Sequence, residues 1–336
     1  MGIESLAYLM EAGEKEDLFD VILKSDCVER GVTPGESILK MTTLYSAIRR
    51  AREGYSPEMR SASGMVGGDG AKMREYAASG KTICGEYIGS VLAQAIEMGE
   101  SNACMKCIVA APTAGSCGVL PAVLLPYQQR ENLSDADMVH ALYIAGAIGQ
   151  VIAKKASIAG AAGGCQAEIG TASAMGAAAL CYLAGGSAAA VCHAAAIAIK
   201  SLLGLVCDPI AGLVEVPCVK RNAAGAMIAM SSADLALAGV RSAVPPDEVI
   251  MAMREVGDKM DVSLRETGLG GVAATPFGQE IAQKMSGEES GIRWKRIGDS
   301  CLSSDPVICF FRRQMGSTGG SSATAYRSGG DGNDEC

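Results

Sequence analysis

Apolar residues recur at intervals of three and four positions through most of the first 285 residues, which is the spacing of an amphipathic helix. Segments 136–153 and 168–206 are apolar on nearly every face, which is typical of long helices buried in a core. Further helices are expected within 1–55, at 219–241 and at 245–257. The pattern therefore predicts a predominantly helical, all-α fold.

Segments rich in Gly or Pro interrupt these helices. A Gly-rich loop at 61–72 (SASGMVGGDGAK) precedes a helical stretch that runs to about residue 100. Segment 207–218 (CDPIAGLVEVPC) is expected to be irregular because Pro209 and Pro217 both resist a continuous helix. A second Gly-rich loop is expected at 268–278 (GLGGVAATPFG).

The helical periodicity ends near residue 286, where a Gly- and Ser-rich sequence begins. Sequences of that composition bury too little apolar surface to fold on their own. We therefore expect two parts, a large helical domain at 1–285 and an atypical C-terminal tail at 286–336 that is partly disordered.

The composition agrees with helices that pack closely. Hydrophobic residues make up 49% of the chain but aromatic residues only 4%, and 42 of the 336 residues are Gly. Strands favour β-branched and aromatic residues, so this balance favours crossed Ala- and Gly-rich helices over a sheet. The net charge is −8 and no basic stripe is present, so nucleic acid is not an expected partner.

Neither membrane insertion nor secretion is expected. Residues 169–199 carry no formal charge, but they are mainly Ala, Gly and Ser and hold few large apolar side chains to drive insertion. Glu4, Glu11 and Glu14 stand where a signal peptide has basic and apolar residues. We expect a cytoplasmic protein whose 13 cysteines are thiols, metal ligands or catalytic groups.

The cysteines fall into two groups of different interest. Cys104 and Cys107 form a single CxxC without a second pair, so two thiols on adjacent helical turns explain them. Cys165, Cys207 and Cys218 lie where helices give way to Gly- or Pro-rich backbone, and thiolates held there suit a soft metal. Composition alone favours buried structural thiols for these three as well.

Four segments resemble the iron–sulfur-dependent L-serine dehydratases, specifically their alpha subunit: APTAGSCGVLPAVL, KKASIAGAAGGCQAEIG, GLVCDPIAGLVEVPCVKRNAAGAM and ETGLGGVAATPFG. The resemblance implies that Cys165, Cys207 and Cys218 bind a [4Fe-4S] cluster and leave one iron open as a Lewis acid. It also implies a lyase that eliminates water from L-serine, giving pyruvate and ammonia, without pyridoxal phosphate. Lys154, Lys155 and Lys200 are accordingly expected at the surface or at helix ends.

Two turns are candidate binding sites for the serine carboxylate. APTAGSCG is expected to form a turn at a helix start, where backbone N–H groups of Thr113, Ala114, Gly115 and Ser116 suit an anion. The loop SGMVGGDG is a weaker second candidate, and an ordinary turn explains either segment equally simply. Its proposed groups are those of Ser63, Gly67 and Gly68.

The general base is not evident in this chain. Of the two histidines, His140 is expected at the surface or as a helix cap, and His193 as a core residue. Lys155, Ser157 and Glu168 flank the first cysteine motif, and Glu168 is expected either to favour a helix start or to act on a ligand. The family resemblance implies a base in an SSSHT-type segment of the beta portion, which this chain lacks. A separate beta subunit is therefore an expected partner.

Three other functions are consistent with the sequence. The first is a related β-elimination that releases sulfide from cysteine. The second is a non-catalytic iron–sulfur scaffold, with Cys117 or Cys192 as a fourth ligand, and the third is a zinc-binding thiol protein. The terminal Cys336 raises the further hypothesis that the tail approaches the cluster.

Overall fold

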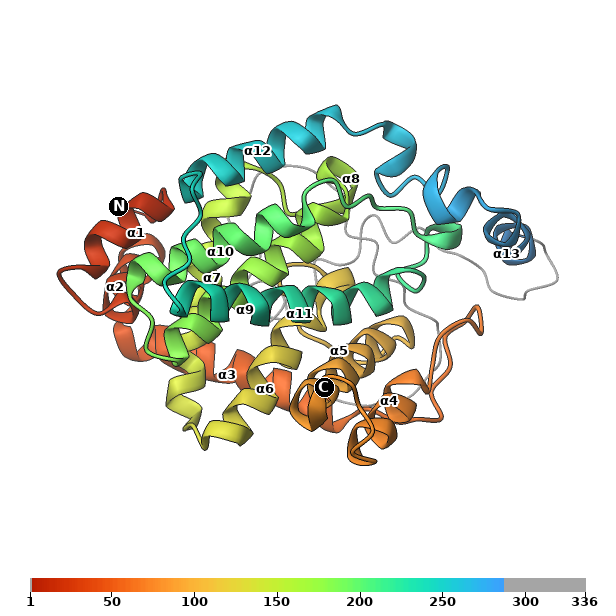
Figure 1. Ribbon diagram of the computed structural model, residues 1–336, viewed down its shortest axis with the longest axis horizontal. Helices are drawn as coiled ribbons and strands as arrows, with labels where there is room; N and C mark the ends of the chain where they lie inside the picture. The colour runs from red at the N-terminus through yellow and green to blue at the C-terminus, as the bar shows by residue number, and fades with distance from the viewer. Residues whose placement is uncertain (1, 287–336) are drawn as a thin grey trace.

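Helices supply the regular structure of residues 2–286, which are the residues that the computed structural model describes (Figure 1). No strand is present among them, and the backbone forms one isolated β-bridge, between Cys207 and Arg265. The predicted all-α fold is therefore confirmed. The predicted disorder of the tail and the hypothesis about Cys336 lie outside the described residues.

The longer helices, in chain order, are α1 (Leu6–Gly13), α2 (Leu18–Arg30), α3 (Pro34–Glu53), α4 (Asp69–Ala78), α5 (Gly85–Ala103), α6 (Val119–Glu131), α7 (Asp135–Lys155), α9 (Thr171–Leu183), α10 (Ala188–Leu202), α11 (Cys218–Leu237), α12 (Pro246–Lys259) and α13 (Pro276–Ser286). Short elements lie between them: α8 (Gly160–Gly163), the π-helix η2 (Gln166–Gly170), and the 3₁₀ turns η1 (Ala114–Ser116), η3 (Ile210–Gly212), η4 (Val262–Leu264) and η5 (Gly271–Ala274).

Helix α9 is the centre of the core, and α6, α7, α10 and α11 pack around it. Every α9 residue from Thr171 to Cys181 is buried, and most of them are Ala, Gly or Ser. A Cβ on Gly176 would lie 3.2 Å from Val123 and 3.3 Å from Ala229, so the small residues allow α6 and α11 to approach closely. This packing fixes the start of α11, where Cys218 lies.

The predicted helix over 168–206 is wrong in its continuity. A π-helix, α9 and α10 occupy this stretch, and a turn at 184–187 separates the last two. Gly185 adopts a left-handed backbone with φ of 80°, and the Ser187 side chain caps α10 by accepting a hydrogen bond from the Ala190 amide. The stretch predicted to run to residue 100 is likewise divided, into α4 and α5.

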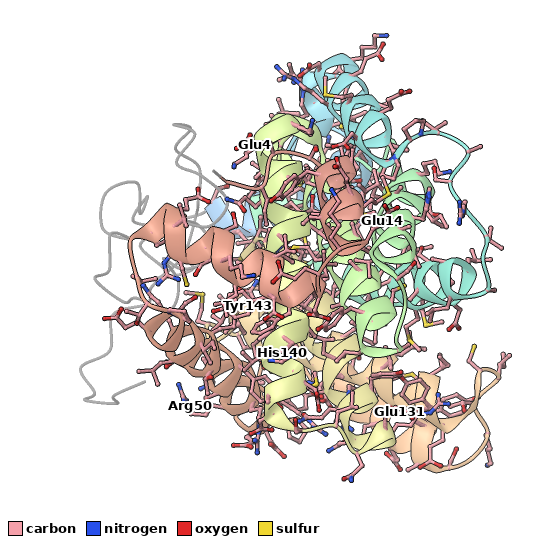
Figure 2. All side chains as sticks on the ribbon, turned by 90° about the vertical axis from the view of Figure 1, so that its left-hand side faces the viewer. Glu4, Glu14, Arg50, Glu131, His140 and Tyr143 are labelled. Carbon is pink, nitrogen blue, oxygen red and sulfur yellow. The ribbon has the colours of Figure 1, made fainter. Side chains whose placement is uncertain are left out.

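Helix starts follow local capping rules. Thr33 and Glu36 form a reciprocal capping box at α3, with Pro34 as its first residue. A similar box opens α7, and His140 lies one turn further on, visible in Figure 2. The His140 ring stacks on Phe19 of α2 at a centroid distance of 3.7 Å, and the residue is partly exposed.

Within the described residues, α7 is the one helix whose length and apolar composition would allow it to cross a membrane. Of its most apolar window, 83% is buried against the rest of the protein. Core helices of globular proteins meet the same length and composition test, so α7 is described here as a core helix.

Candidate active site

The three cysteines lie on three different segments that meet beside α8 and the start of α11. Cys165 directly precedes the π-helix η2, Cys207 lies in the loop after α10, and Cys218 is the first residue of α11. Their exposed fractions are 3%, 3% and 7%. A π-helical turn is rare and often marks a functional site, so its position immediately after Cys165 is notable.

The thiols are close enough to influence one another's ionisation. Burial raises the pKa of Cys165 to about 12, with the neighbouring charge of Glu168 adding to the rise. Burial also raises the pKa of Cys207, with contributions from Glu168, Cys165 and Cys218. The pKa of Cys218 is raised for the same reasons. The protein alone therefore holds three neutral thiols, and a soft metal centre would be needed to stabilise them as thiolates.

The donor set fits an iron–sulfur cluster better than a single ion. Among residues 2–286, no three His, Cys, Asp or Glu side chains are placed to hold one metal ion. A cluster binds each thiolate through a different iron, so its cysteines need not converge on one point. Three buried soft donors on separate segments are consistent with that arrangement.

A short backbone pairing holds Cys207 in place. The Cys207 amide donates to the Leu264 carbonyl at 2.8 Å, and the Glu266 amide donates to the Cys207 carbonyl at 2.7 Å. Glu266 has a φ of 63°, a left-handed backbone that residues other than Gly rarely adopt. The pairing thus brings the conspicuous ETGLGG motif against the second cysteine, and the Glu266 carboxyl contributes to the raised pKa of Cys207.

Glu168 joins the thiols to the APTAGSCG turn. Its Oε2 atom lies 3.8 Å from Cys207 Sγ, and its side chain lies near that of Thr113, which lowers the pKa of the carboxyl. Burial raises the pKa of Glu168 to about 7, and the nearby charge of Glu266 adds to this rise. Glu168 therefore lies between the cysteines and the turn, a more specific position than the start of a helix, which was one of the two roles expected from the sequence.

The turn that contains η1 is held by hydrogen bonds within itself. Thr113 Oγ1 and Ser116 Oγ lie 3.1 Å apart, and the Ser116 and Cys117 amides donate to Thr113 and Ala114 carbonyls. Ser116 is fully buried, whereas Thr113, Ala114 and Gly115 are partly exposed. The structure therefore brings the predicted turn to the cysteines, with its first three residues more accessible than Ser116.

Sequence reasoning missed Asn222, which fixes this turn to α11. Its Oδ1 accepts from the Gly118 amide at 2.8 Å, and its Nδ2 donates to the Gly115 carbonyl at 2.9 Å. Asn222 lies four residues after Cys218, on the same face of the helix. That spacing is a signal that could have identified it.

Arg221, also missed, binds the other side of the site. It donates to the Val206 carbonyl at 2.8 Å and forms an ion pair with Asp208 at 2.8 Å. Its interaction with the Cys165 side chain opposes the rise in that thiol's pKa. Burial lowers the pKa of Arg221, but its electrostatic interactions with Cys165, Asp208 and Cys218 raise it overall.

The groups of the second predicted loop bind other protein atoms. The Ser63 hydroxyl donates to Glu215, three residues before Cys218. A Cβ on Gly67 would lie 2.0 Å from the Met59 carbonyl oxygen, so the chain itself fills that space. Gly68 caps α4 with a left-handed backbone.

The remaining candidates are placed elsewhere. Cys117 and Cys192, considered as fourth ligands, are buried and donate to the Met98 and Leu6 carbonyls. Lys155 pairs with Asp247, and Ser157 Oγ accepts from the Ala159 amide. Cys104 is half-buried after α5, Cys107 is exposed, and burial lowers the pKa of the half-buried His193 on α10.

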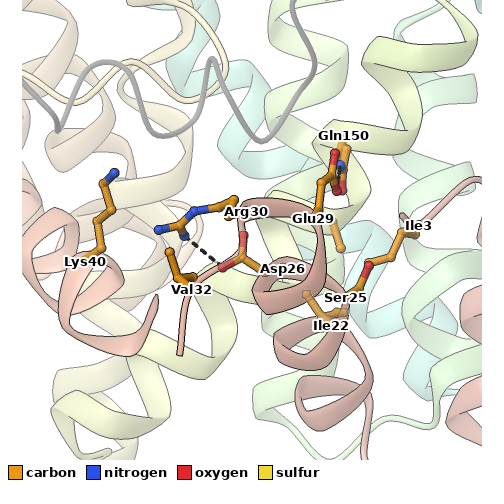
Figure 3. Close-up of a pocket in the computed structure, with 10 residues that line it drawn as sticks. Ile3, Ile22, Ser25, Asp26, Glu29, Arg30, Val32, Lys40 and Gln150 are labelled. Carbon is orange, nitrogen blue, oxygen red and sulfur yellow. Dashed lines mark hydrogen bonds and ion pairs between the residues drawn. The ribbon is translucent and has the colours of Figure 1, made fainter. Parts of the chain in front are cut away.

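A cavity of about 440 Å³ lies away from these residues, beside α2, α3 and α7 (Figure 3). It is lined by charged side chains including Glu29 and Lys40, and an ion pair between Asp26 and Arg30 crosses its wall. None of the predicted site residues lines it.

Substitution of Asn222 by Ala is expected to loosen the APTAGSCG turn without unfolding the protein. The change leaves the Gly118 amide and the Gly115 carbonyl without their side-chain partner, which costs about 1–3 kcal/mol for a buried group. Thermal unfolding should show this loss. Asn222→Asp keeps the acceptor for Gly118 but places a buried carboxylate against the Gly115 and Cys218 carbonyl oxygens, so it should lose at least as much stability. An unfolding temperature unchanged by Asn222→Ala would contradict the role of this residue.

The fold and the site define a class: a helical protein whose irregular loops gather three buried thiols beside two carboxyl groups and the turn at 113–116. The family described as serine dehydratase alpha chain matches residues 10–273. The chain belongs to this family.

Two alpha chains match this chain along most of their length, and a longer relative matches it over part of its length. The chain is 49% identical over 253 residues to the probable L-serine dehydratase alpha chain of Bacillus subtilis, covering 75% of this chain and 83% of that one. It is 45% identical over 265 residues to the L-serine dehydratase alpha chain of Peptoniphilus asaccharolyticus, covering 79% and 91%. It is also 45% identical over 183 residues to L-serine dehydratase TdcG of Escherichia coli, but these are 40% of that longer chain.

Proposed function

We propose that this chain is the alpha subunit of an L-serine dehydratase, a lyase that converts L-serine to pyruvate and ammonia. The names of the Bacillus and Peptoniphilus relatives support the reaction, because the match extends over more than four fifths of each relative. The observation that carries the proposal is the meeting of Cys165, Cys207 and Cys218 beside the turn at 113–116.

Cys165, Cys207 and Cys218 are proposed to hold a [4Fe-4S] cluster. When bound through three cysteines, such a cluster supplies an open iron, which acts as a Lewis acid toward the hydroxyl group that serine must lose. No pyridoxal phosphate is required, and the lysines closest to the first cysteine motif are engaged in ion pairs with Glu4 and Asp247.

The turn at 113–116 is proposed to bind the serine carboxylate. The partly exposed Thr113, Ala114 and Gly115 offer backbone N–H groups, while Ser116 serves to hold the turn in shape. Glu168 contacts both Thr113 and Cys207, so it can orient an amino acid between the turn and the thiols. Ser63, Gly67 and Gly68 are the weaker alternative for the carboxylate, because Ser63 already binds Glu215.

A separate beta subunit is proposed to complete the enzyme and to supply the general base. The relatives' designation as alpha chains implies a second chain, and the matched region is 40% of the Escherichia coli relative. His140 stacks on Phe19, which leaves it poorly suited to proton transfer at the cysteines. The assembled enzyme is proposed to act in the cytoplasm, where these thiols remain reduced.

Anaerobic spectroscopy tests this proposal. The purified or reconstituted chain is expected to contain about four iron and four sulfide ions, as a [4Fe-4S] cluster requires. Its EPR and visible spectra should change when L-serine is added, and pyruvate should form once the beta chain is present. Sulfide release from L-cysteine with no pyruvate from L-serine would favour the desulfidase alternative. A cluster that ignores both amino acids would favour a scaffold.

A further inference from the structure

Arg221 occupies a position that links the three cysteine segments. It lies on the first turn of α11, three residues after Cys218. From there its guanidinium lies near the Cys165 side chain and donates to the Val206 carbonyl, immediately before Cys207. One cationic side chain therefore contacts, or lies within one turn of, every cysteine of the site.

Asp208 extends this link to the loop that covers Cys207. Its Oδ1 atom pairs with Arg221, and its Oδ2 atom accepts from the Val272 amide at 2.8 Å. The backbone of Gly271 approaches so closely that a Cβ there would lie 2.2 Å from Asp208 Oδ2. The ion pair thus connects α11, the loop after α10 and the loop at η5.

The charges of the site give this cation a second role. Two carboxyl groups, Glu168 and Glu266, face thiols that become anionic on binding metal. Arg221 acts against them, since its guanidinium lies beside Cys207, where it donates to the Val206 carbonyl, and within one helical turn of Cys218. A buried ion pair contributes little net stability in general, so stability alone is a weak explanation for placing Arg221 and Asp208 here.

We propose that Arg221, oriented by Asp208, is the positioning residue of the iron–sulfur site: it holds the three cysteine segments in register and compensates the negative charge that they gather. The inference rests on the proposed function, because it assigns the metal site to these cysteines. It predicts that the charge of this pair tunes the reduction potential of the bound cluster, since such potentials depend on nearby charge and on hydrogen bonds to sulfur.

Three variants separate the two roles. Arg221→Gln removes a positive charge and should shift the potential to more negative values, whereas Asp208→Asn removes a negative charge and should shift it to more positive values. Arg221→Lys keeps the charge but not the planar fork, so its potential should stay near that of the wild type. Both Arg221 variants should release iron to a chelator about 10- to 100-fold faster, as when a group that orients metal ligands is lost.

The control is Arg30→Gln. Arg30 and Asp26 form a pair of similar burial, with side chains 20% and 4% exposed against 17% and 3% for Arg221 and Asp208. Arg30 lies on α2, which packs against α1, α3 and α7. Arg30→Gln should leave both the potential and the rate of iron release unchanged. A general loss of stability would affect Arg30→Gln as much as Arg221→Gln. Such a loss cannot produce the opposite shifts in reduction potential that are expected for Arg221→Gln and Asp208→Asn.

A measurement without metal keeps the inference separate from the proposed function. In the cluster-free protein, amide exchange at Val272 should be faster in Arg221→Gln and in Asp208→Asn than in the wild type, because the link to α11 is lost. Unchanged exchange, or shifts in potential of the same sign, would overturn the role of Arg221 while leaving the cluster assignment intact. If the wild type itself binds no cluster, the proposed function fails together with the charge-compensating role, and exchange at Val272 still decides the structural link.

Discussion

Replacement of Cys165, Cys207 or Cys218 by Ala is expected to remove the proposed iron–sulfur cluster and with it all serine dehydratase activity. Each thiol is buried and each belongs to a different segment, so none of the three can be replaced by a neighbour on the same segment. Loss of one of three ligands leaves the cluster with too few thiolates to be retained. Iron and sulfide content after anaerobic reconstitution, with EPR, measures the effect directly.

Cys181→Ala is the matched control. Cys181 is fully buried, but it lies on α9 within the main apolar core. Its loss should reduce stability modestly, through the small volume removed, and leave the iron content unchanged. Cys117→Ala tests whether a fourth protein ligand exists, and the proposed open iron requires that it too keep its cluster. Full iron content in any one of the three principal variants would refute the assignment of that cysteine.

Gly160→Ala is expected to reduce cluster binding strongly while the protein remains folded. A Cβ at this position would lie 2.8 Å from Glu168 Oε2 and 2.9 Å from Cys207 Sγ. Both atoms are ends of side chains that can rotate away, so the fold tolerates the change. Rotation of Cys207 moves a ligand out of register, however, and metal sites tolerate errors of only about 0.5 Å. The iron content of Gly160→Ala should therefore fall strongly, while its thermal unfolding temperature stays close to that of the wild type.

Gly163→Ala provides the comparison, because it makes the same change at the other end of α8. There the new Cβ would lie 3.2 Å from Ala167 Cβ and near no atom of the cysteines. This variant should keep its iron, within the small strain that the contact imposes. Equal iron content in the two variants would show that the close approach at Gly160 has no functional importance.

The sequence predicted well those features that depend on neighbours along the chain. The period of apolar residues predicted the all-α fold, and the capping box that opens α3 is formed by neighbours along the chain, Thr33 and Glu36. The division between α9 and α10 was missed, although Gly185 and Ser187 carry it, because the surrounding Ala-rich sequence has no polar interruption. The family, now shown by the match over residues 10–273, was recognisable from the sequence motifs around the cysteines.

Local pattern in the sequence is sufficient for the helical class and for the family, and the resemblance to that family names Cys165, Cys207 and Cys218 as candidate ligands. What the tertiary structure decided is how these parts meet. Asn222 reaches Gly118 across 104 residues of sequence, and the Asp208 carboxylate reaches the Val272 amide across 64. No local rule determines such partners, because they depend on how closely the small-residue helices around α9 pack. The roles proposed here for Glu168, Asn222 and Arg221 come from that packing.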